Sequence, residues 1–292
     1  PTCTVIDSYH GATAKEDREV LAQLYLREFS EHHISPYEND NRLLYPRLEY
    51  TWPNVPADGG EVPEEELEEV FRPEFNWDTW DPEMTRIIDT YHFNAFRLFA
   101  PGLGAGEAWS SNLLTHYGED TPEFKTAFKA WYSAVQEHFR KKGWLDKAFI
   151  YWFDEPTAEQ YEFCIKYNLM MKEAAPDLQR MLTEQVEPEL IGGPNLWCPV
   201  SHYYNHEAAE PRRLAGDRFW WYVCSTPMAP YATLFIDHPA TEMRVWLWQT
   251  WQRKINGLLI WDTIWWTSNA AYPDRLQNPY EDPMNWCPIM EG

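Results

Sequence analysis

The fold is decided by the stretch Lys147-Ala148-Phe149-Ile150-Tyr151-Trp152-Phe153-Asp154-Glu155-Pro156. An uninterrupted apolar run leads up to two adjacent acids, and such a run is typical of a strand buried on both faces of a parallel sheet. We predict a strand over 147–153. Directly after it, Thr157 and Gln160 match a capping box and predict a helix to about Ala175. A buried strand followed at once by a helix is the repeating unit of an α/β protein.

The same unit recurs along the chain. Strands are predicted at 2–6, 34–37, 94–99, 147–153, 179–183, 195–200, 218–224 and 258–261, and helices at about 15–33, 81–91, 121–142, 157–175 and 239–256. Eight strands with mostly helical crossovers in about 270 residues match a closed (β/α)8 barrel of the TIM type. A doubly wound open sheet is the alternative, but no glycine-rich phosphate loop follows the first strand. The predicted fold class is therefore α/β, a (β/α)8 barrel.

The barrel is expected to occupy residues 1–292 as one domain, with an acidic, irregular insertion at about 38–80. Between Asp58 and Asp89 lie 12 acidic and 2 basic residues, a net charge of −10. Such a segment is a solvated insertion or a wall over a cleft. The chain starts at Pro1, and four X-Pro steps after Trp266 interrupt the place of an eighth helix. We therefore expect the barrel to be truncated at both ends.

Charge and composition exclude several classes of function. The chain has 24 Lys and Arg against 46 Asp and Glu, a formal charge of −22, whereas nucleic-acid binding requires clustered basic side chains. Its apolar runs are far shorter than the roughly 20 residues that span a bilayer, so no membrane insertion is expected. The nine His show no HExxH or comparable spacing, and neither a metal nor another cofactor is predicted.

Aromatic residues are unusually frequent, with 17 Trp, 17 Tyr and 14 Phe. Trp246 and Trp251 share a stripe of the helix predicted at 239–256, and we expect both in the core. Aromatic residues at the predicted strand ends have another use, because flat rings stack on the C–H faces of sugars. The aromatic excess thus divides into a core part and a candidate sugar site.

The active site of such a barrel lies at the carboxyl ends of the strands. Asp154 and Glu155 are the candidate catalytic residues, since two carboxyl groups flanking a bond perform glycoside hydrolysis. They can share one site only if the strand has already turned into its loop, because neighbours in a regular strand point to opposite faces; Pro156 favours that ending. The candidate substrate-binding residues are Arg97, Glu184, Trp197, His202, Tyr203, Tyr222, Trp261 and Trp265.

Several motifs resemble the catalytic domain of glycoside hydrolase family 123. They are Lys142-Gly143-Trp144-Leu145-Asp146-Lys147 followed by Tyr151-Trp152-Phe153-Asp154-Glu155-Pro156, then Trp220-Trp221-Tyr222-Val223-Cys224, Phe235-Ile236-Asp237-His238-Pro239 followed by Arg244, and the segment 257–265. The resemblance runs in family order from about residue 9 to 267. Family members carry a β-sandwich domain before the barrel and more chain after it. The acidic insertion has no counterpart that can be matched residue by residue.

The resemblance implies a retaining β-N-acetylgalactosaminidase, or a related N-acetylhexosaminidase, that works by substrate assistance. The 2-acetamido oxygen of the substrate attacks the anomeric carbon and forms an oxazolinium ion. On this hypothesis Asp154 orients the acetamido group, whereas Glu155 protonates the leaving oxygen and then activates water. The partner is an oligosaccharide or glycoconjugate, and the habitat of such enzymes implies a secreted or periplasmic protein.

Two alternatives remain open from the sequence. In a different retaining glycosidase, Glu155 would still be the acid/base, with Glu184, Asp237 or Asp262 as the nucleophile. In a non-catalytic carbohydrate-binding protein, the aromatic cleft would bind sugar without turnover. The linkage cleaved, the preference between galacto and gluco sugars and the oligomeric state are not determined by these patterns.

Overall fold

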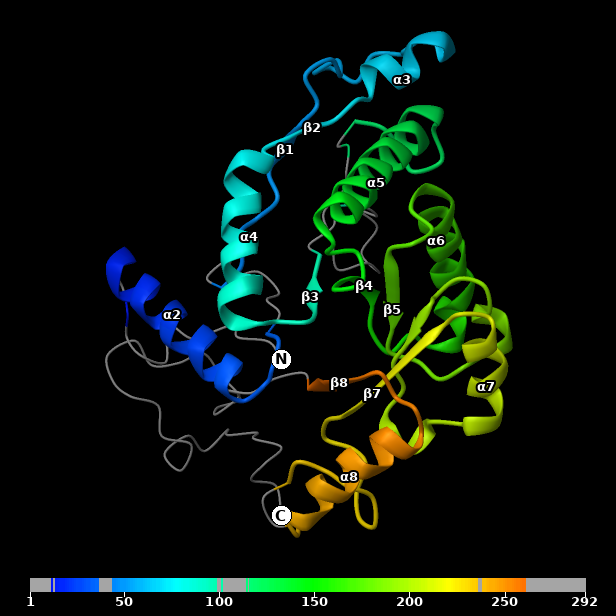
Figure 1. Ribbon diagram of the computed structural model, residues 1–292. Coiled ribbons are helices and arrows are strands. Elements are labelled where there is room, and N and C mark those ends of the chain that lie inside the picture. The colour runs from blue at the N-terminus through cyan, green and yellow to red at the C-terminus, as the bar shows by residue number, and fades with distance from the viewer. Residues whose placement is uncertain are drawn as a thin grey trace, which may run out of the picture.

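The structure is a computed structural model that describes residues 12, 14–36, 44–98, 101, 114, 116–235 and 238–260. Its centre is a parallel sheet whose strands follow one another in chain order and curl into a half-barrel (Figure 1). The six strands are β3 (Phe96–Arg97), β4 (Ala148–Phe153), β5 (Gln179–Leu182), β6 (Leu196–Trp197), β7 (Arg218–Val223) and β8 (Gly257–Ile260). Adjacent parallel strands in sequence order are the mark of a (β/α)8 barrel, so the predicted fold class is confirmed over this part of the chain.

Helices cover the outer side of the sheet (Figure 1). The crossovers that contain an α-helix carry α5 (Pro122–Lys142), α6 (Tyr161–Ala174), α7 (His206–Leu214) and α8 (Thr241–Gln252). The connection from β5 to β6 contains only the short 3-10 helix η3 (Pro188–Leu190). Each connection returns the chain to the same end of the sheet, so consecutive strands lie parallel and side by side, with all their carboxyl ends at one edge.

The two faces of the sheet bury different side chains. Phe149, Tyr151, Leu196 and Tyr222 belong to a cluster on the inner face, whereas the main core beneath the helices takes the alternate positions, such as Ile150. This alternation is the period of two of a β-strand. Both faces are apolar because helices cover one and the curl of the sheet encloses the other.

Caps define the ends of the helices beside β4. Thr121 accepts a hydrogen bond from the backbone N–H of Phe124 at 3.2 Å, with Pro at the first helical position of α5. Gly143 ends this helix with φ of 71°, a left-handed conformation that glycine adopts at little cost. The capping box of Thr157 and Gln160 opens the 3-10 turn η2 (Ala158–Gln160) that leads into α6. These caps fix where β4 begins and how the chain leaves it.

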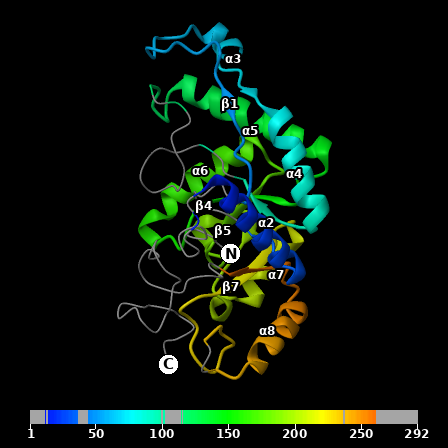
Figure 2. The same ribbon diagram turned by 90° about the vertical axis from the view of Figure 1, so that its left-hand side faces the viewer.

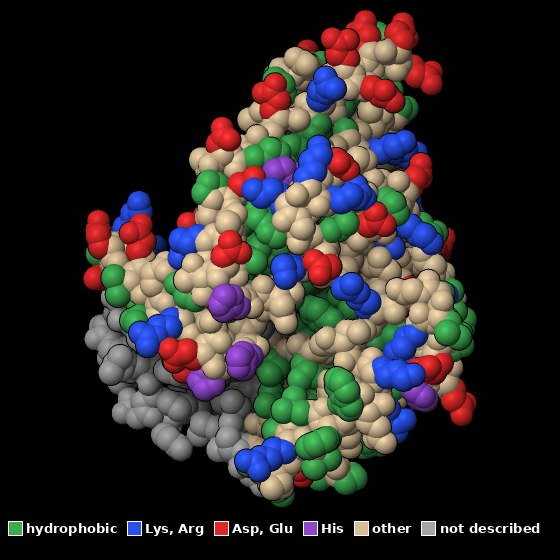
Figure 3. Space-filling model, viewed as in Figure 1, with side chains coloured by type: hydrophobic (Ala, Val, Ile, Leu, Met, Phe, Trp, Pro, Cys, Tyr) green, Lys and Arg blue, Asp and Glu red, His purple; other side chains and the backbone are tan. Residues whose placement is uncertain are grey.

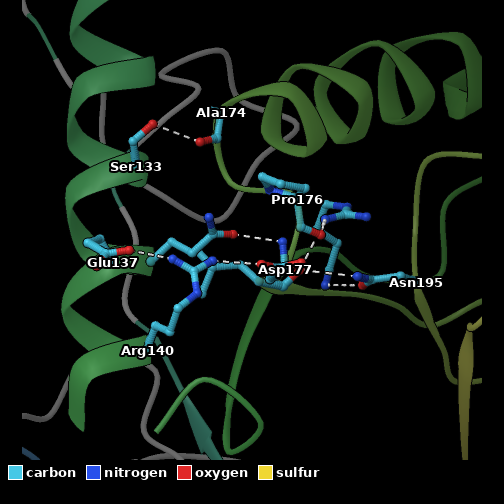
Figure 4. A network of polar contacts seen from close by, with 10 residues as sticks. Ser133, Glu137, Arg140, Ala174, Pro176, Asp177 and Asn195 are labelled. Atoms are coloured by element: carbon cyan, nitrogen blue, oxygen red, sulfur yellow. Dashed lines mark hydrogen bonds and ion pairs between the residues drawn. The ribbon is translucent and has the colours of Figure 1, made fainter. Parts of the chain in front are cut away.

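A network of polar contacts lies at the amino-terminal end of β5 (Figure 4). Arg140 on α5 donates to Asp177 at 2.7 Å, and the hydroxyl of Ser133 donates to the carbonyl of Ala174 at 2.8 Å. Arg180 on β5 is 4% exposed and donates to the carbonyls of Pro176, Leu178 and Gly193 at 3.0–3.1 Å. Burial lowers the pKa of its guanidinium to about 10, so the side chain stays charged at neutral pH. The register of β5 is therefore held from the amino-terminal side.

The N-terminal part agrees with the predictions only in part. The strand expected at 2–6 lies outside the described residues, and residues 34–36 form no strand. Helix α2 (Lys15–Glu31) confirms the helix expected at 15–33, and its Ala22, Leu26 and Phe29 are buried.

The acidic segment is more ordered than predicted where the structure describes it. Strands β1 (Tyr50–Thr51) and β2 (Glu74–Phe75) pair antiparallel, and η1 (Glu64–Glu66) leads into α3 (Leu67–Val70) between them. Leu67 and Phe71 are buried in the main core, so the segment packs on the barrel through an apolar side. Its acids are exposed and gather at the end of the molecule that carries α3, opposite α8 (Figures 2 and 3).

Helix α4 (Trp77–Tyr91) begins about one turn before residue 81, where the sequence predicts its start. Pro82 lies inside the helix, where its missing N–H costs a backbone hydrogen bond. Packing outweighs that cost, because Trp80 is 3% exposed and Trp77 stacks on His138 with ring centroids 3.6 Å apart. Proline favours the first turn of a helix, but the burial of aromatic rings here extends the helix by one turn before Pro82.

Helix α8 corrects the expectation that both of its stripe tryptophans lie in the core. Trp246 is 1% exposed, but Trp251 is 83% exposed. Five residues correspond to about 140° around a helix axis, so the two rings cannot face the same side.

We expect the two tryptophans of α8 to differ sharply in their effect on stability. Trp246→Ala should lower the free energy of unfolding by about 3–5 kcal/mol, because it opens a cavity in the core. Trp251→Ala should change it by less than about 0.5 kcal/mol, because the ring makes little buried contact. Urea unfolding of both variants measures the difference, and equal losses would contradict this placement of α8.

Candidate active site

The carboxyl ends of β4, β5 and β7 bring four side chains into one hydrogen-bonded group. Asp154 and Glu155 follow β4, Thr183 follows β5, and Tyr222 lies near the end of β7. The hydroxyl of Thr183 donates to Oδ1 of Asp154 at 2.8 Å, and the hydroxyl of Tyr222 donates to Oε1 of Glu155. The side chains of both acids are exposed, so a ligand can reach them at the edge where barrel enzymes bind their substrates.

A break in the strand pattern places both adjacent acids in this group. The pairing of β4 with β5 shifts between Tyr151 and Phe153, as at a β-bulge, which re-aims the following side chains. Trp152 and Phe153 both lie in the outer core, and Asp154 then accepts a hydrogen bond from Tyr151 of the inner face. Glu155 has φ of 46°, a left-handed conformation rare for residues other than glycine. The expected turn out of the strand is confirmed.

Hydroxyl groups donate to one oxygen of each carboxylate. Oδ1 of Asp154 accepts from the hydroxyls of Tyr151 and Thr183. The hydroxyl of Tyr222 is a proton donor at neutral pH, because burial, together with its bond to Glu155 and the charge of that carboxylate, raises the pKa of the phenol far above its ordinary value. Cys198 after β6 is also buried nearby: burial, and secondarily the charge of Asp154, raise the pKa of its thiol. Four consecutive strands thus border the acid pair.

Glu184, a predicted substrate-binding residue, lies beside this group. Burial is the largest cause that raises the pKa of its half-buried carboxyl, and the charge of Glu155 is a smaller one. Hydrogen bonds from the backbone N–H of Gln185, at 3.0 Å, and from the hydroxyl of Tyr161 act in the opposite direction. Glu184 directly follows Thr183, so a third carboxyl lies next to the hydrogen-bonded group.

Arg97 lies on the neighbouring strand β3 and contacts Tyr151. Its Nη2 donates to the carbonyl of Tyr151 at 3.0 Å, and its guanidinium lies 5.5 Å from the centre of the Tyr151 ring. Since Tyr151 donates to Asp154, Arg97 supports the residue that holds the acid. Its role in substrate binding stays a prediction.

His202 and Tyr203 lie on the short 3-10 helix η4 (Ser201–Tyr203) after β6. Their rings are 3.9 Å apart, and His202 also lies 5.6 Å from the ring of Tyr231. Burial lowers the pKa of His202, so its ring is neutral at neutral pH. Tyr203 is 59% exposed, as a ring that stacks on a sugar must be. Within the described residues, no hydrogen bond joins this pair to the two acids.

Trp197 is not part of the site. Its ring is fully buried in the outer core, and its indole N–H donates to Asp217 at 2.8 Å. The neighbouring Cys198 takes the inner face instead, because successive residues of a strand alternate. Trp261 and Trp265, and the alternative nucleophiles Asp237 and Asp262, lie outside the described residues.

Two residues of the site were missed from the sequence. Thr183 and Tyr151 each hold Asp154 through a hydroxyl group. Tyr151 lies inside an apolar strand, where no sequence pattern distinguishes it from a core residue. Thr183 directly precedes Glu184, and the prediction selected only Glu184 at that strand end. The signal that could have found Thr183 is its position: it is the first polar residue after β5, on the strand next to β4.

Comparison with known protein families decides the identity of the fold. The model of the glycoside hydrolase 123 catalytic domain matches residues 82–290. The chain belongs to glycoside hydrolase family 123. In this family 123 chain, the Asp154–Glu155 pair lies inside the matched catalytic region. A comparison with curated proteins finds no match.

A solved structure shares the fold of this family 123 chain. It is that of a family 123 glycoside hydrolase from Clostridium perfringens, described in a study of glycolipid glycan hydrolysis, with a TM-score of 0.56 and 13% sequence identity. The alignment covers 96% of this chain and 51% of that chain, so this chain spans about half the length of that relative. Within the described residues, no group of His, Cys, Asp or Glu side chains could hold a metal ion, and no helix is long and apolar enough to cross a membrane.

Proposed function

We propose that this family 123 domain is a retaining β-N-acetylhexosaminidase that releases terminal β-linked N-acetylgalactosamine, or a related N-acetylhexosamine, by substrate assistance. The observation that carries the proposal is the turn at Glu155. Its left-handed backbone puts two adjacent carboxylates into one hydroxyl-lined group at the strand ends. Two acids in such a place suit a reaction that needs one of them for the leaving group and the other for the acetamido group.

In the first step the acetamido oxygen attacks the anomeric carbon while the bond to the leaving oxygen breaks. Asp154 accepts the acetamido N–H and stabilises the positive charge of the oxazolinium ion, and Glu155 gives its proton to the leaving oxygen. An intramolecular nucleophile of this kind reaches effective molarities of about 10⁵–10⁸ M. No enzyme carboxylate then needs to approach the anomeric carbon.

In the second step Glu155, now ionised, takes a proton from water, and the water oxygen attacks the anomeric carbon. The oxazolinium ring opens, and the acetamido group is restored. Two successive inversions at the anomeric carbon give net retention. Tyr222 supports both steps, because its hydroxyl contacts Oε1 of Glu155.

The substrate is proposed to be the glycan of an oligosaccharide or glycoconjugate. The Clostridium perfringens relative comes from a study of glycolipid glycan hydrolysis, which makes glycolipid glycans the first glycoconjugates to test. The exposed ring of Tyr203 is available for stacking on a sugar at the same edge of the sheet.

One other mechanism has a specific observation in its favour. Glu184 directly follows Thr183, which donates to Asp154, and the charge of Glu155 is the smallest of the causes that raise its pKa. A second carboxyl near the acid is what a retaining enzyme with its own nucleophile requires. In that mechanism Glu184 would attack the anomeric carbon, and the 2-acetamido group would be dispensable.

Hydrolysis of three 4-nitrophenyl β-glycosides tests the proposal. We expect release of 4-nitrophenol from the N-acetylgalactosamine and N-acetylglucosamine derivatives, with the ratio reporting the preference at C4, and none from the galactose derivative. Equal hydrolysis of the galactoside would overturn substrate assistance in favour of a nucleophile such as Glu184. Tight sugar binding without any turnover would instead identify a carbohydrate-binding protein.

A further inference from the structure

We propose that Thr183 is a positioning residue whose single hydroxyl group holds both catalytic acids. This inference rests on the proposed function, and it assigns a task to a residue on a different strand from the acid pair. The hydroxyl lies 2.8 Å from Oδ1 of Asp154 and 2.7 Å from the backbone nitrogen of Glu155. One side chain therefore contacts both acids, one through its carboxylate and the other through its backbone.

The direction of the two hydrogen bonds follows from chemistry. A backbone N–H can only donate, so the oxygen of Thr183 accepts from Glu155. The one hydroxyl proton is then free to donate to the carboxylate of Asp154, which accepts. Thr183 is 4% exposed, so solvent does not compete for these bonds. The result is a fixed chain from the Glu155 backbone through Thr183 to Asp154.

The hydrogen bond from the amide of Glu155 to Thr183 stabilises an unfavourable backbone conformation. The φ of 46° at Glu155 persists only where neighbouring structure holds it. Without the acceptor on Thr183, the amide of Glu155 loses its partner and the residue is free to return toward extended geometry. Neighbouring side chains would then point to opposite sides, and Glu155 would leave the hydroxyl of Tyr222.

The bond to Asp154 fixes which carboxylate oxygen is offered to substrate. Oδ1 accepts from both Tyr151 and Thr183, and no hydrogen bond reaches Oδ2 from the part of the chain that is described. Two donors on one oxygen prevent rotation of the carboxylate about its own axis. Oδ2 is then the atom available to the acetamido N–H.

Strand register brings Thr183 to this position. Phe153 pairs with Leu182 after the shift in the β4–β5 ladder, so the next residues, Asp154 and Thr183, lie side by side. Without the shift, Asp154 would lie opposite Glu184 instead of Thr183. The bulge is therefore required for the hydrogen bond between Thr183 and Asp154.

The test compares Thr183→Val with Thr183→Ser on the N-acetylgalactosamine 4-nitrophenyl substrate. Valine keeps the shape and removes the hydroxyl, and serine keeps the hydroxyl. Loss of hydrogen bonds to a charged group corresponds to about 10- to 100-fold, and we expect Thr183→Val to lose that factor in kcat with little change in KM. Thr183→Ser should stay within about 3-fold of the unchanged protein, because it restores the same donor and acceptor.

Thr233→Val is the matched control. Thr233 is 2% exposed, and its hydroxyl has no hydrogen-bond partner among the described residues. The same substitution there should leave kcat unchanged. Wild-type kcat in Thr183→Val, or equal losses in the serine and valine variants, would overturn the positioning role.

Crystal structures of Thr183→Val and Thr183→Ser give a readout that does not depend on turnover. In the valine variant we expect Glu155 to leave positive φ or the Asp154 carboxylate to rotate, and in the serine variant neither. Unchanged acids in the valine variant would overturn the inference even in an active enzyme. Inactivity of the unchanged protein toward all three glycosides would instead count against the proposed function, while the structures still decide the role of Thr183.

Discussion

Replacing the carboxyl group of Glu155 by an amide is expected to abolish most hydrolysis of substrates with poor leaving groups. Glu155→Gln cannot give a proton to the departing oxygen, and general acid catalysis by a placed carboxyl contributes about 10²–10⁴ in rate. Without that proton, the leaving group of a natural glycan would be a strongly basic alkoxide, which departs slowly. A 4-nitrophenolate leaves without it, so the loss on 4-nitrophenyl glycosides should be smaller. Steady-state kcat/KM on both kinds of substrate measures the ratio.

The control for this variant is Glu162→Gln, an exposed residue on the neighbouring helix α6, which should retain full activity. A loss that is the same for good and poor leaving groups would contradict the acid role of Glu155. So would retained turnover of a disaccharide.

Asp154→Asn is expected to lower activity regardless of the leaving group. The carboxylate stabilises the positive charge of the oxazolinium ion, and removal of one such preorganised electrostatic partner costs about 10²–10³ in kcat. The proton donor is untouched, so good and poor leaving groups should suffer alike. Rates on a series of aryl N-acetylgalactosaminides would show the same dependence on the leaving group as the unchanged protein, displaced downward.

Asp146→Asn serves as the matched control, because Asp146 is exposed just before the opposite end of β4. It should leave the rates unchanged. If Asp154→Asn turned over substrate at the wild-type rate, substrate assistance through this residue would be wrong. A loss confined to poor leaving groups would exchange the roles assigned to the two acids.

Much of the fold could be predicted because local signals agree with it. The apolar run before Asp154 and the capping box before α6 appear where expected, and the helix predicted at 121–142 is α5. Each of these signals acts within a few residues. A local signal fails where a distant packing partner outweighs it: Pro82 lies within α4 because Trp77 and Trp80 are packed in the turn before it.

The candidate site divides in the same way. Asp154 and Glu155 could be selected from the chain alone, since two acids end a buried strand. The prediction of Trp197 as a substrate-binding residue is wrong, because a position at a strand end does not determine on which face of the sheet the ring lies. Thr183 was missed because its importance depends on which residue of β4 it adjoins, and that depends on the shift in register.

The α/β class, the strand that carries the acid pair and the resemblance to family 123 follow from the sequence, because they depend on short-range patterns of apolar residues, caps and motifs. The meeting of the adjacent acids in one site follows from the folded structure alone. In a regular strand they would point apart, and their convergence requires the bulge after Tyr151, the left-handed backbone of Glu155 and hydroxyl groups from β5 and β7. Those contacts join residues 28 and 67 positions away along the chain, and only the folded sheet brings them within hydrogen-bonding distance.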